Sequence, residues 1–389
     1  MPYKDKYDLI IVGGGVLGTF SAYHALRLGK SVALIERNKT PQEATVRNFG
    51  QIVPSGLNQE WKKFGFKSLE IYKQLQSIHD FTVRSHGSYY VASNEDEVTL
   101  LHELLQTDKS IDYESKILSA REACERLPGL KSQYCAEALH YPEEVSVDPR
   151  KMISLVIDYL TEVYQLTYLP YTIAQHFELD ANGDCQITTN TKIKLTAEQL
   201  LICNGVEFQL LFPEYYLNEE TECVKIHMMM TKPQSSLRFY GNVLTGLSIR
   251  RYEAFRECPS YSLIVEKNAA DPRIKQWGIH ILFKQTDNGQ IIIGDSHHYA
   301  DAHDKEELGF DNQQDVNEYI LDLAKEIFDL ETYQIDTTWT GIYSQAKKVD
   351  IISKSIEGKI HILNAIGGKG MTAGPGYTYY HIRKLFGHD

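Results

Sequence analysis

Three glycines near the start of the sequence have the spacing of a turn that binds phosphate groups. Gly13, Gly15 and Gly18 follow an apolar run and open a helical pattern. The first glycine permits a tight bend, the second lets the backbone approach a pyrophosphate, and the third lets the helix pack closely on the strand. Because free N–H groups at the start of a helix attract phosphate, the spacing predicts a dinucleotide-binding turn.

The elements around this turn support the prediction. Residues 7–12 (YDLIIV) and 31–36 (SVALIE) are short apolar runs typical of strands, and the helical pattern between them stops at Gly29. Glu36 ends the second strand, where a carboxylate accepts hydrogen bonds from the ribose hydroxyls of an adenine dinucleotide. A glycine turn without a ligand is the alternative, and the coincidence of strand, helix and terminal acid argues against it.

A second glycine cluster favours FAD over NAD(P) as the dinucleotide. The sequence IGGKGMTAGPG (366–376) follows an apolar strand, and such a turn can direct N–H groups at the pyrimidine edge of a flavin. The first glycine turn lies at the extreme N-terminus, and no second G-x-G-x-x-G provides a separate nicotinamide domain. We expect FAD to contact these residues of the two regions: Gly13, Gly15, Val16, Leu17, Gly18, Glu36, Arg37, Gly367, Gly368, Lys369, Gly370, Met371 and Thr372.

The composition excludes several classes of protein. The 389 residues include 40 Lys or Arg and 52 Asp or Glu, a net charge of −12, without a clustered basic block, so nucleic acid and anionic membranes are poor candidates as partners. No apolar run approaches the roughly 20 residues of a membrane span. The six cysteines show no spacing typical of a metal site, so we expect reduced thiols, no bound metal and a cytoplasmic protein.

The order of the remaining patterns predicts the architecture. Helical spacing occurs at 61–78, 95–107, 119–128, 147–164 and 312–329. Strand-like runs occur at 87–93, 165–204 and 359–368 and through the middle of the chain, there including 243–250, 260–267 and 277–285. We expect an α/β fold in which a Rossmann-like FAD-binding domain (1–85, 141–212 and 336–389) carries an inserted antiparallel-sheet α+β substrate domain (86–140 and 213–335).

Several segments resemble the D-amino acid oxidase, glycine oxidase and sarcosine oxidase group of FAD-dependent oxidoreductases. The resemblance covers nearly the whole chain and rests on the first β-turn-α-β unit, RNFGQIVPSG (47–56), SVDPRKM (146–152), LLICNG (200–205) and the C-terminal glycine turn. It implies oxidation of a small amine by hydride transfer to the flavin, followed by imine hydrolysis. It also implies that further residues lie at the cofactor, namely Arg47, Asn48, Phe49, Gly50, Gln51, Asn204 and Gly205.

One motif departs from the family pattern. The family usually has a W-x-G-x-R-P segment whose arginine binds the substrate carboxylate, whereas WTGIYSQ (339–345) has Tyr343 in that place and Ser344 for the proline. Other segments are similar to a subgroup associated with aminophosphonate breakdown: LFPE (211–214), MMMTKPQ (228–234), LTGLSIRRYEAF (244–255), GIHILFKQ (278–285) and IIIGDSHHY (291–299). The similarity implies a small anionic amine as substrate, such as 2-aminoethylphosphonate or its N-methyl derivative.

An anionic head group needs cations to bind it. Arg250 and Arg251 follow the run VLTGLSI, and in a strand adjacent side chains face opposite sides, so at most one of them would point into a cavity. Arginine suits a phosphonate because it donates two parallel hydrogen bonds. We expect substrate contacts from Arg250, Arg251, Tyr252, His227 and Met228, and groups at the reacting centre from Lys369, Tyr343 and His280. His297 and His298 are more typical of polar strand-end histidines than of a metal pair.

Three classes of function remain open at this point. The leading interpretation is an FAD-dependent amine oxidoreductase, with glycine, sarcosine or a D-amino acid as alternative substrates. An NAD(P)-dependent dehydrogenase would use the same first unit, and a nucleotide-holding scaffold would catalyse no reaction. A yellow protein that an amine bleaches in the absence of oxygen would be evidence for the first class.

Overall fold

The computed structural model describes residues 4–217, 221–267 and 271–388. Its first large sheet begins with the predicted β-turn-α-β unit. The strands of this sheet are β1 (Tyr7–Val12), β2 (Val32–Ile35), β8 (Thr167–Leu169), β9 (Ala174–Leu179), β10 (Cys185–Thr189), β11 (Lys194–Ile202), β18 (Ile352–Ile356) and β19 (Ile360–Asn364). Their order is β18-β19-β11-β1-β2-β8, with β10 beside β11 and β9 beside β10. The pairs from β19 to β8 are parallel, so segments far apart in sequence form one α/β sheet, as predicted.

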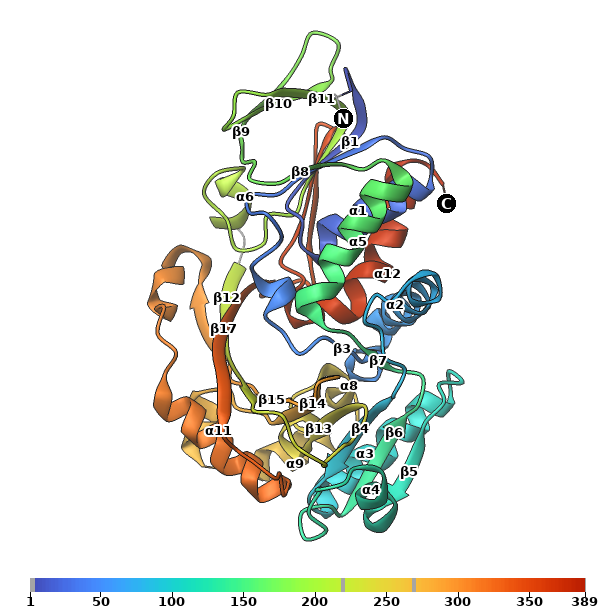
Figure 1. Cartoon of the computed structure of the whole chain (residues 1–389), viewed down its shortest axis with the longest axis vertical. Helices are drawn as coiled ribbons and strands as arrows, with labels where there is room; N and C mark the ends of the chain where they lie inside the picture. The colour runs from blue at the N-terminus through green and yellow to red at the C-terminus, as the bar shows by residue number, and fades with distance from the viewer. Residues whose placement is uncertain (1–3, 218–220, 268–270, 389) are drawn as a thin grey trace.

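Four long helices lie on one side of this sheet in the view of Figure 1: α1 (Val16–Arg27), α2 (Gln59–Ile78), α5 (Pro149–Tyr164) and α12 (Gly370–Leu385). Helix α1 packs against α5 and α12, and α12 packs against α2. The predicted cap of α5 is present: the Asp148 side chain accepts a hydrogen bond from Arg150 N at 3.0 Å, and Pro149 occupies the first turn. This packing fixes the N-termini of α1 and α12, which carry the two glycine clusters.

The second large sheet is mostly antiparallel. Its strands are β4 (Ser88–Ala92), β5 (Lys116–Ser119), β6 (Glu137–Tyr141), β12 (Thr221–Thr231), β13 (Asn242–Thr245), β14 (Leu282–Gln285), β15 (Ile291–Gly294), β16 (His298–Asp301) and β17 (Ile335–Ala346). The order is β16-β12-β15-β14-β13-β4-β6-β5, with β17 beside β12. The pair β13–β4 is parallel, so the sheet is antiparallel except at this pair. The long strands β12 and β17 run side by side between the two parts of the molecule (Figure 1).

The other elements are a short two-stranded ladder and several helices. Strands β3 (Gln51–Ile52) and β7 (Val145–Ser146) form a two-stranded ladder. Helices α3 (Glu95–Lys109), α4 (Ala120–Arg126) and α11 (Gln314–Ile327) match predicted helices, and Ser119 and Glu122 form the capping box expected at α4. The remaining helical elements are α6 (Pro213–Leu217), α8 (Glu253–Arg256), α10 (Pro272–Gln276), η1 (Ala44–Val46), η2 (Pro54–Gly56), η3 (Ala302–Leu308) and η4 (Gly367–Lys369).

The strand predictions in the middle of the chain were wrong at three places. Residues 246–249 form the helical turn α7 (Gly246–Ile249), and residues 261–267 form α9 (Tyr261–Lys267). In the run 277–285, the strand begins only at Leu282. Short apolar runs fit a buried helix as well as a strand, and tertiary packing decides between them. Here Ile249 and Ile264 are buried in one cluster with Leu100 and Leu104 of α3.

Two further findings concern the whole described chain. In the part of the structure that is described, no helix combines the length and the apolar character that crossing a bilayer requires. All six cysteines are free, as the scattered thiols predicted. The predicted boundaries between the two domains stay a prediction.

Candidate active site

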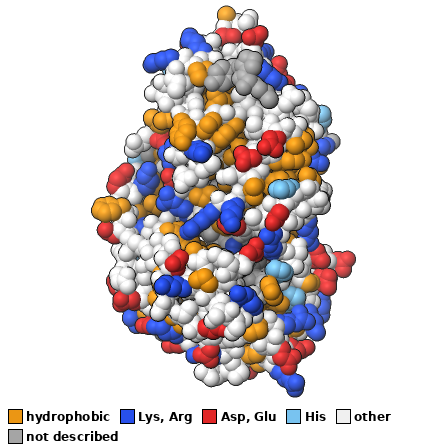
Figure 2. All heavy atoms as spheres, viewed as in Figure 1, with side chains coloured by type: hydrophobic (Ala, Val, Ile, Leu, Met, Phe, Trp, Pro, Cys, Tyr) orange, Lys and Arg blue, Asp and Glu red, His pale blue; other side chains and the backbone are white. Residues whose placement is uncertain are grey.

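A cavity of about 610 Å³ lies between the glycine clusters and the second sheet. Its wall includes Gly15, Val16 and Leu17 of α1, residues 47–51, and residues 367–372 of the C-terminal turn. Three segments that the sequence assigned to the cofactor thus meet in one space. Figure 2 shows basic and acidic side chains gathered around a hollow in the middle of one face. The charged residues of the cavity wall are Arg47, Arg251, Arg256, Lys347, Lys348, Lys369, Glu43, Glu253 and Asp350, together with Asp295.

The first glycine turn has the three geometric properties that a pyrophosphate site requires. Gly13 has φ +100°, and a Cβ there would lie 2.2 Å from the Cys203 carbonyl oxygen. A Cβ on Gly18 would lie 1.9 Å from Gly13 O, so this helix residue must be glycine to pack on the strand. Gly15 lines the cavity, and a Cβ there would approach within 4 Å only Thr45 Oγ1, at 3.2 Å. The backbone is therefore open to a ligand at Gly15.

The segment at 47–51 is held rigidly against the cavity. Asn48 Nδ2 donates to the carbonyl oxygens of Ala44 and Thr45 at 2.9 Å each, and Asn48 Oδ1 accepts from Gly50 N at 2.7 Å. Gly50 has φ +69°. Gln51 Nε2 is buried and has no hydrogen-bond partner among the described residues. An unpaired buried donor on a cavity wall fits a polar ring ligand such as a flavin, which has carbonyl and ring-nitrogen acceptors.

Several predicted cofactor residues lie just behind the cavity wall. Glu36 accepts hydrogen bonds from Gly14 N at 3.0 Å and Asn38 N at 2.9 Å, and each carboxylate oxygen keeps a further lone pair. Arg37 pairs with Glu43 at 2.7 Å. Gly205 lines the cavity, whereas the Asn204 side-chain oxygen accepts hydrogen bonds from Tyr216 Oη and Asn364 Nδ2. The cofactor-binding roles of these residues stay predictions.

Lys369 lies in the predicted turn and on the cavity wall. Its Nζ contacts Glu253 Oε1 at 2.8 Å and also pairs with Asp350, and it lies 4.9 Å from the centre of the Trp61 ring. Two carboxylates therefore balance the ammonium charge. Lys369 links the C-terminal turn to α8 and to the loop after β17, and it is not an unpaired cation facing the cofactor.

The adjacent residues Arg250 and Arg251 lie in different environments, although they follow a helical turn and not the predicted strand. Arg250 Nε lies 2.8 Å from Glu97 Oε1 of α3, and Arg250 is absent from the cavity wall. Arg251 lines the cavity, where its Nη2 donates to Tyr299 Oη at 2.6 Å. The structure thus brings Arg251, and not Arg250, to the candidate site.

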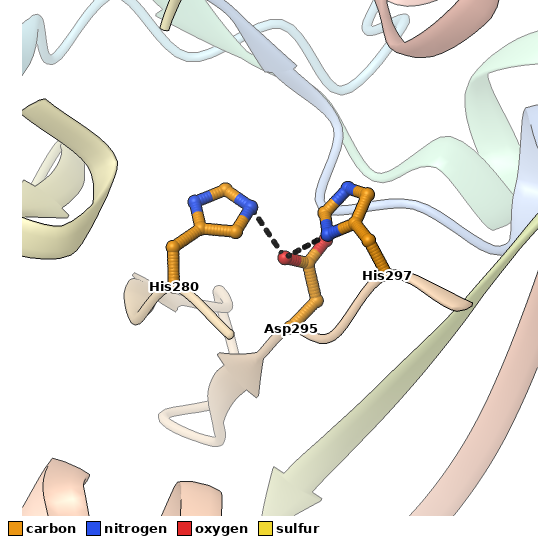
Figure 3. Close-up of side chains that lie close together, drawn as sticks. All are labelled: His280, Asp295 and His297. Carbon is orange, nitrogen blue, oxygen red and sulfur yellow. Dashed lines mark ion pairs between the residues drawn. The ribbon is translucent and has the colours of Figure 1, made fainter. Parts of the chain in front are cut away.

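A buried cluster of His280, Asp295 and His297 forms one end of the cavity (Figure 3). His280 Nε2 lies 2.6 Å from Asp295 Oδ1, and His297 Nδ1 lies 3.7 Å from the same oxygen. Burial alone would raise the pKa of the Asp295 carboxyl, but its interactions with the neighbouring His280 and His297 imidazoles and with Arg251 outweigh burial, so this pKa lies below its ordinary value. Burial lowers the pKa of His297 to about 3. Asp295 is therefore a carboxylate and His297 a neutral imidazole at neutral pH.

Two tyrosines flank this cluster. The Tyr252 ring lies 6.0 Å from the His280 ring, and the Tyr343 ring lies 6.5 Å from the His297 ring. Burial raises the pKa of both phenols, so both are neutral donors at neutral pH. Both line the cavity, as predicted residues of the site should.

Three other predicted residues lie away from the cavity. His227 Nδ1 lies 2.8 Å from Ser296 Oγ, and its Nε2 accepts from Gln313 N at 3.2 Å. Met228 is fully buried in an apolar cluster with Ile226, and the His298 ring lies 5.1 Å from the His227 ring at an angle of 59°. His227 faces the side of β12 opposite to Ile226, which lines the cavity, whereas Met228 shares the face of Ile226 and is covered by the apolar cluster.

Asp295 and Thr45 are among the residues of this site that the sequence analysis did not predict. Asp295 directly follows the strand IIIG, and an acid at a strand end between histidines was the available signal. Thr45 lines the cavity and accepts a hydrogen bond from Val16 N at 3.0 Å, and no sequence pattern singled it out.

Comparison with known proteins identifies the family. Residues 8–378 match the family model described as DAO, FAD dependent oxidoreductase. Glycine oxidase from Bacillus subtilis is 22% identical over 240 residues, which are 57% of this chain and 62% of that protein. Human mitochondrial sarcosine dehydrogenase is 26% identical over 156 residues, which are 38% of this chain and 17% of that protein. The chain thus spans less than two thirds of the length of these relatives.

The fold agrees with this match. Glycine oxidase from Geobacillus kaustophilus superposes with a TM-score of 0.78 at 17% identity and covers 99% of this chain and 96% of its own. L-proline dehydrogenase from P. horikoshii superposes with a TM-score of 0.77 at 17% identity and covers 99% and 94%. The matched family model is FAD dependent, so the cofactor is FAD, and its contacts with the two glycine clusters stay a prediction. With a family match over nearly its whole length and the same fold, the chain belongs to the DAO family of FAD-dependent oxidoreductases.

Proposed function

We propose that this protein oxidises a small amine that carries an anionic group, and that its substrate is 2-aminoethylphosphonate or the N-methyl derivative. The proposal rests on the side chains at two positions of the cavity wall, Tyr343 and Arg251. Tyr343, a neutral phenol, stands where the resemblance places a carboxylate-binding arginine, while Arg251 enters the same cavity from the end of α7. The proposed anion-binding cation is therefore contributed by the end of α7 and not by β17.

The residues of the chain have separable tasks in this reaction. FAD, when bound, supplies the hydride acceptor for the carbon next to nitrogen, and the oxidised substrate is hydrolysed to a carbonyl compound and an amine. Gly15 leaves room for the pyrophosphate, and Gln51 presents an unpaired donor to the ring. Arg251 binds the anion through parallel hydrogen bonds. Tyr252, Tyr343 and Leu282 line the space around the reacting carbon and exclude water.

A carboxylate substrate is the second candidate, because glycine oxidase and sarcosine dehydrogenase are among the relatives. Arg251 would also bind a carboxylate, but a phosphonate offers three oxygens, and the wall adds the Tyr343 phenol next to the arginine. The cavity thus presents more donors than a single carboxylate needs. We favour the phosphonate for this reason.

The proposal is tested by steady-state oxidation of N-methyl-2-aminoethylphosphonate by wild type, Arg251→Ala, Arg251→Lys and Arg250→Ala. Loss of a buried charge-assisted contact costs about 2–4 kcal/mol of transition-state binding, so Arg251→Ala should lose roughly thirty-fold or more in kcat/KM. Arg251→Lys should lose less, because it keeps the charge. Arg250→Ala should retain kcat/KM and lose stability through unpaired Glu97. Equal losses in both alanine variants would contradict the assignment of Arg251.

A further inference from the structure

Asp295 is a buried carboxylate with unused hydrogen-bonding capacity. The residue is 7% exposed, and its Oδ1 receives no hydrogen bond from any residue in the described part of the chain. The nearest nitrogen is His280 Nε2, 2.6 Å from Oδ1, and its contact with the carboxylate helps to lower the pKa of Asp295. A buried carboxylate oxygen without a donor is costly, so a ligand that donates to it would stabilise the site.

The backbone fixes this carboxylate toward the cavity. Asp295 N donates to His280 O at 2.7 Å, and His280 N donates to Asp295 O at 3.1 Å. The His280 ring is held on its other side, where Nδ1 lies 3.1 Å from Ser248 Oγ. Asp295 is therefore placed by two hydrogen-bonded chain segments, and its side chain lies close to those of His280 and His297 (Figure 3). It lines the same cavity as Tyr252 and Tyr343.

The geometry of the cluster is better suited to an organic cation than to a metal ion. The ligand atoms of His280, Asp295 and His297 lie within 4.8 Å of one another. Two ligands at about 2.1 Å from a tetrahedral zinc ion would lie roughly 3.3 Å apart. The 2.6 Å separation of His280 Nε2 and Asp295 Oδ1 is shorter than this, because these atoms contact each other directly.

The cavity wall carries one positive and one negative side chain that together complement a zwitterionic ligand. Arg251 is close enough to Asp295 to lower the pKa of its carboxyl, and both side chains line the cavity. His297 stays neutral in the same place and adds no charge. A ligand with an anionic group at one end and an ammonium group at the other would satisfy both side chains at once.

We infer that Asp295 binds the amine nitrogen of the substrate, opposite the anion held by Arg251. This inference rests on the proposed function, because it names the residue that recognises the nitrogen of the same substrate. Asp295 accepts a hydrogen bond from the substrate N–H, and His280 positions the carboxylate. The site thereby selects amines over anions that lack the nitrogen.

The experiment measures binding without turnover. The FAD-loaded protein is reduced chemically under anaerobic conditions, so that it cannot oxidise an amine, and ligand binding is followed by calorimetry. Two ligand pairs are compared, 2-aminoethylphosphonate with ethylphosphonate and sarcosine with acetate. The proteins are wild type, Asp295→Asn, Asp295→Glu and Asp336→Asn, the last an exposed aspartate on β17 outside the cavity wall.

We expect wild type to bind the amine of at least one pair about tenfold or more tightly than its nitrogen-free partner. Asp295→Asn should weaken binding of that amine about tenfold and leave the nitrogen-free anion unchanged or tighter, because a repelling carboxylate is gone. Asp295→Glu should keep part of the preference, and Asp336→Asn should behave as wild type. This opposite response of amine and anion distinguishes recognition from a fold defect, which would weaken both ligands.

The outcomes separate this inference from the choice of substrate. A preference for sarcosine over acetate that Asp295→Asn removes, with no binding of either phosphonate, would support Asp295 and overturn the phosphonate. If Asp295→Asn still binds the amine more tightly than its nitrogen-free partner, the role of Asp295 is overturned. The role is also overturned if wild type shows this preference in neither ligand pair. Equal weakening of amine and anion in Asp295→Asn, with normal FAD content, would show a purely structural residue.

Discussion

Arg250 and Arg251 are neighbours in sequence but point to opposite sides of the end of α7. Arg250 Nε lies 2.8 Å from Glu97 Oε1 in the packing between α7 and α3, and Arg251 Nη2 lies 2.6 Å from Tyr299 Oη at the cavity. One arginine thus holds the helical turn in place while the other is available to a ligand. This division of tasks is the structural basis of the proposed anion site.

The first prediction concerns the pyrophosphate site. Gly15→Val places a branched side chain where the backbone is open to the cavity, so the variant should purify without flavin absorbance. Gly374→Ala is the control, because a Cβ there meets only ordinary contacts, at 3.5 Å or more, within α12. Undiminished flavin content in Gly15→Val would refute the placement of the pyrophosphate.

The second prediction concerns Glu36. Glu36→Ala removes an acceptor of two backbone hydrogen bonds and the expected acceptor of the ribose hydroxyls. A lost hydrogen bond to a charged group costs about 1.5–3 kcal/mol, so FAD affinity should fall about tenfold or more. Titration of the apoprotein with FAD measures the affinity. Glu36→Gln keeps one acceptor oxygen, so its affinity for FAD should lie between those of wild type and Glu36→Ala. Equal affinities of wild type and Glu36→Ala would exclude the role.

The third prediction concerns the ion-pair cluster at the cavity mouth. Lys369→Met leaves Glu253 and Asp350 without their shared cation. The lysine side chain is 13% exposed and its partners are partly exposed, so the free energy of unfolding should fall by about 1–2 kcal/mol, between the values of surface and buried pairs. Urea unfolding measures this loss, and Lys369→Arg should restore most of it. An unchanged midpoint in Lys369→Met would show that the pairs contribute nothing.

The fourth prediction concerns a buried carboxyl beneath the cavity. Burial raises the pKa of Glu144 from 4.5 to about 7, although Ser55 N and Tyr113 Oη both donate to its Oε1 at 2.8 Å. Between pH 4.5 and 7 the folded protein keeps a proton that the unfolded chain has released. This contribution to stability is therefore complete below pH 4.5 and is lost as the pH rises through 7.

Glu144→Gln stays neutral at every pH and removes this dependence. Relative to wild type, the variant should gain up to about 3 kcal/mol of unfolding free energy as the pH rises from 4.5 to 7. Urea unfolding at several pH values measures the difference, with Glu162→Gln on the exposed side of α5 as the control. A difference that does not vary with pH would show that Glu144 ionises normally.

Local sequence patterns predicted the glycine turn and the helices of the first sheet well, because a few neighbouring residues determine these features. The roles of Gly13, Gly15 and Gly18 follow from chain geometry over six residues, and the cap at Asp148 follows from two neighbours. The substrate half was harder to predict. The run 243–249 has strand-like composition, yet its second half is helical and packs against α3, and the sequence could not tell which of Arg250 and Arg251 faces the cavity.

Asp295 shows a second limit of prediction from sequence. Its partner His280 is 15 positions earlier in the chain and lies just before β14, the strand that pairs with β15. The pairing of β14 with β15 sets their register, and no spacing rule in one sequence specifies that register. A strand-end acid becomes a binding residue only when tertiary structure closes the cavity around it.

The most direct test of the account is the rate at which different amines bleach the bound flavin when oxygen is absent. The panel is glycine, sarcosine, D-alanine, L-proline, 2-aminoethylphosphonate and its N-methyl derivative, each mixed with the yellow holoenzyme and followed by its visible absorbance. The account predicts that one of the two phosphonates bleaches the flavin fastest, because Arg251 binds its anion and Asp295 its nitrogen. Faster bleaching by glycine, sarcosine or another α-amino acid would contradict the proposed substrate.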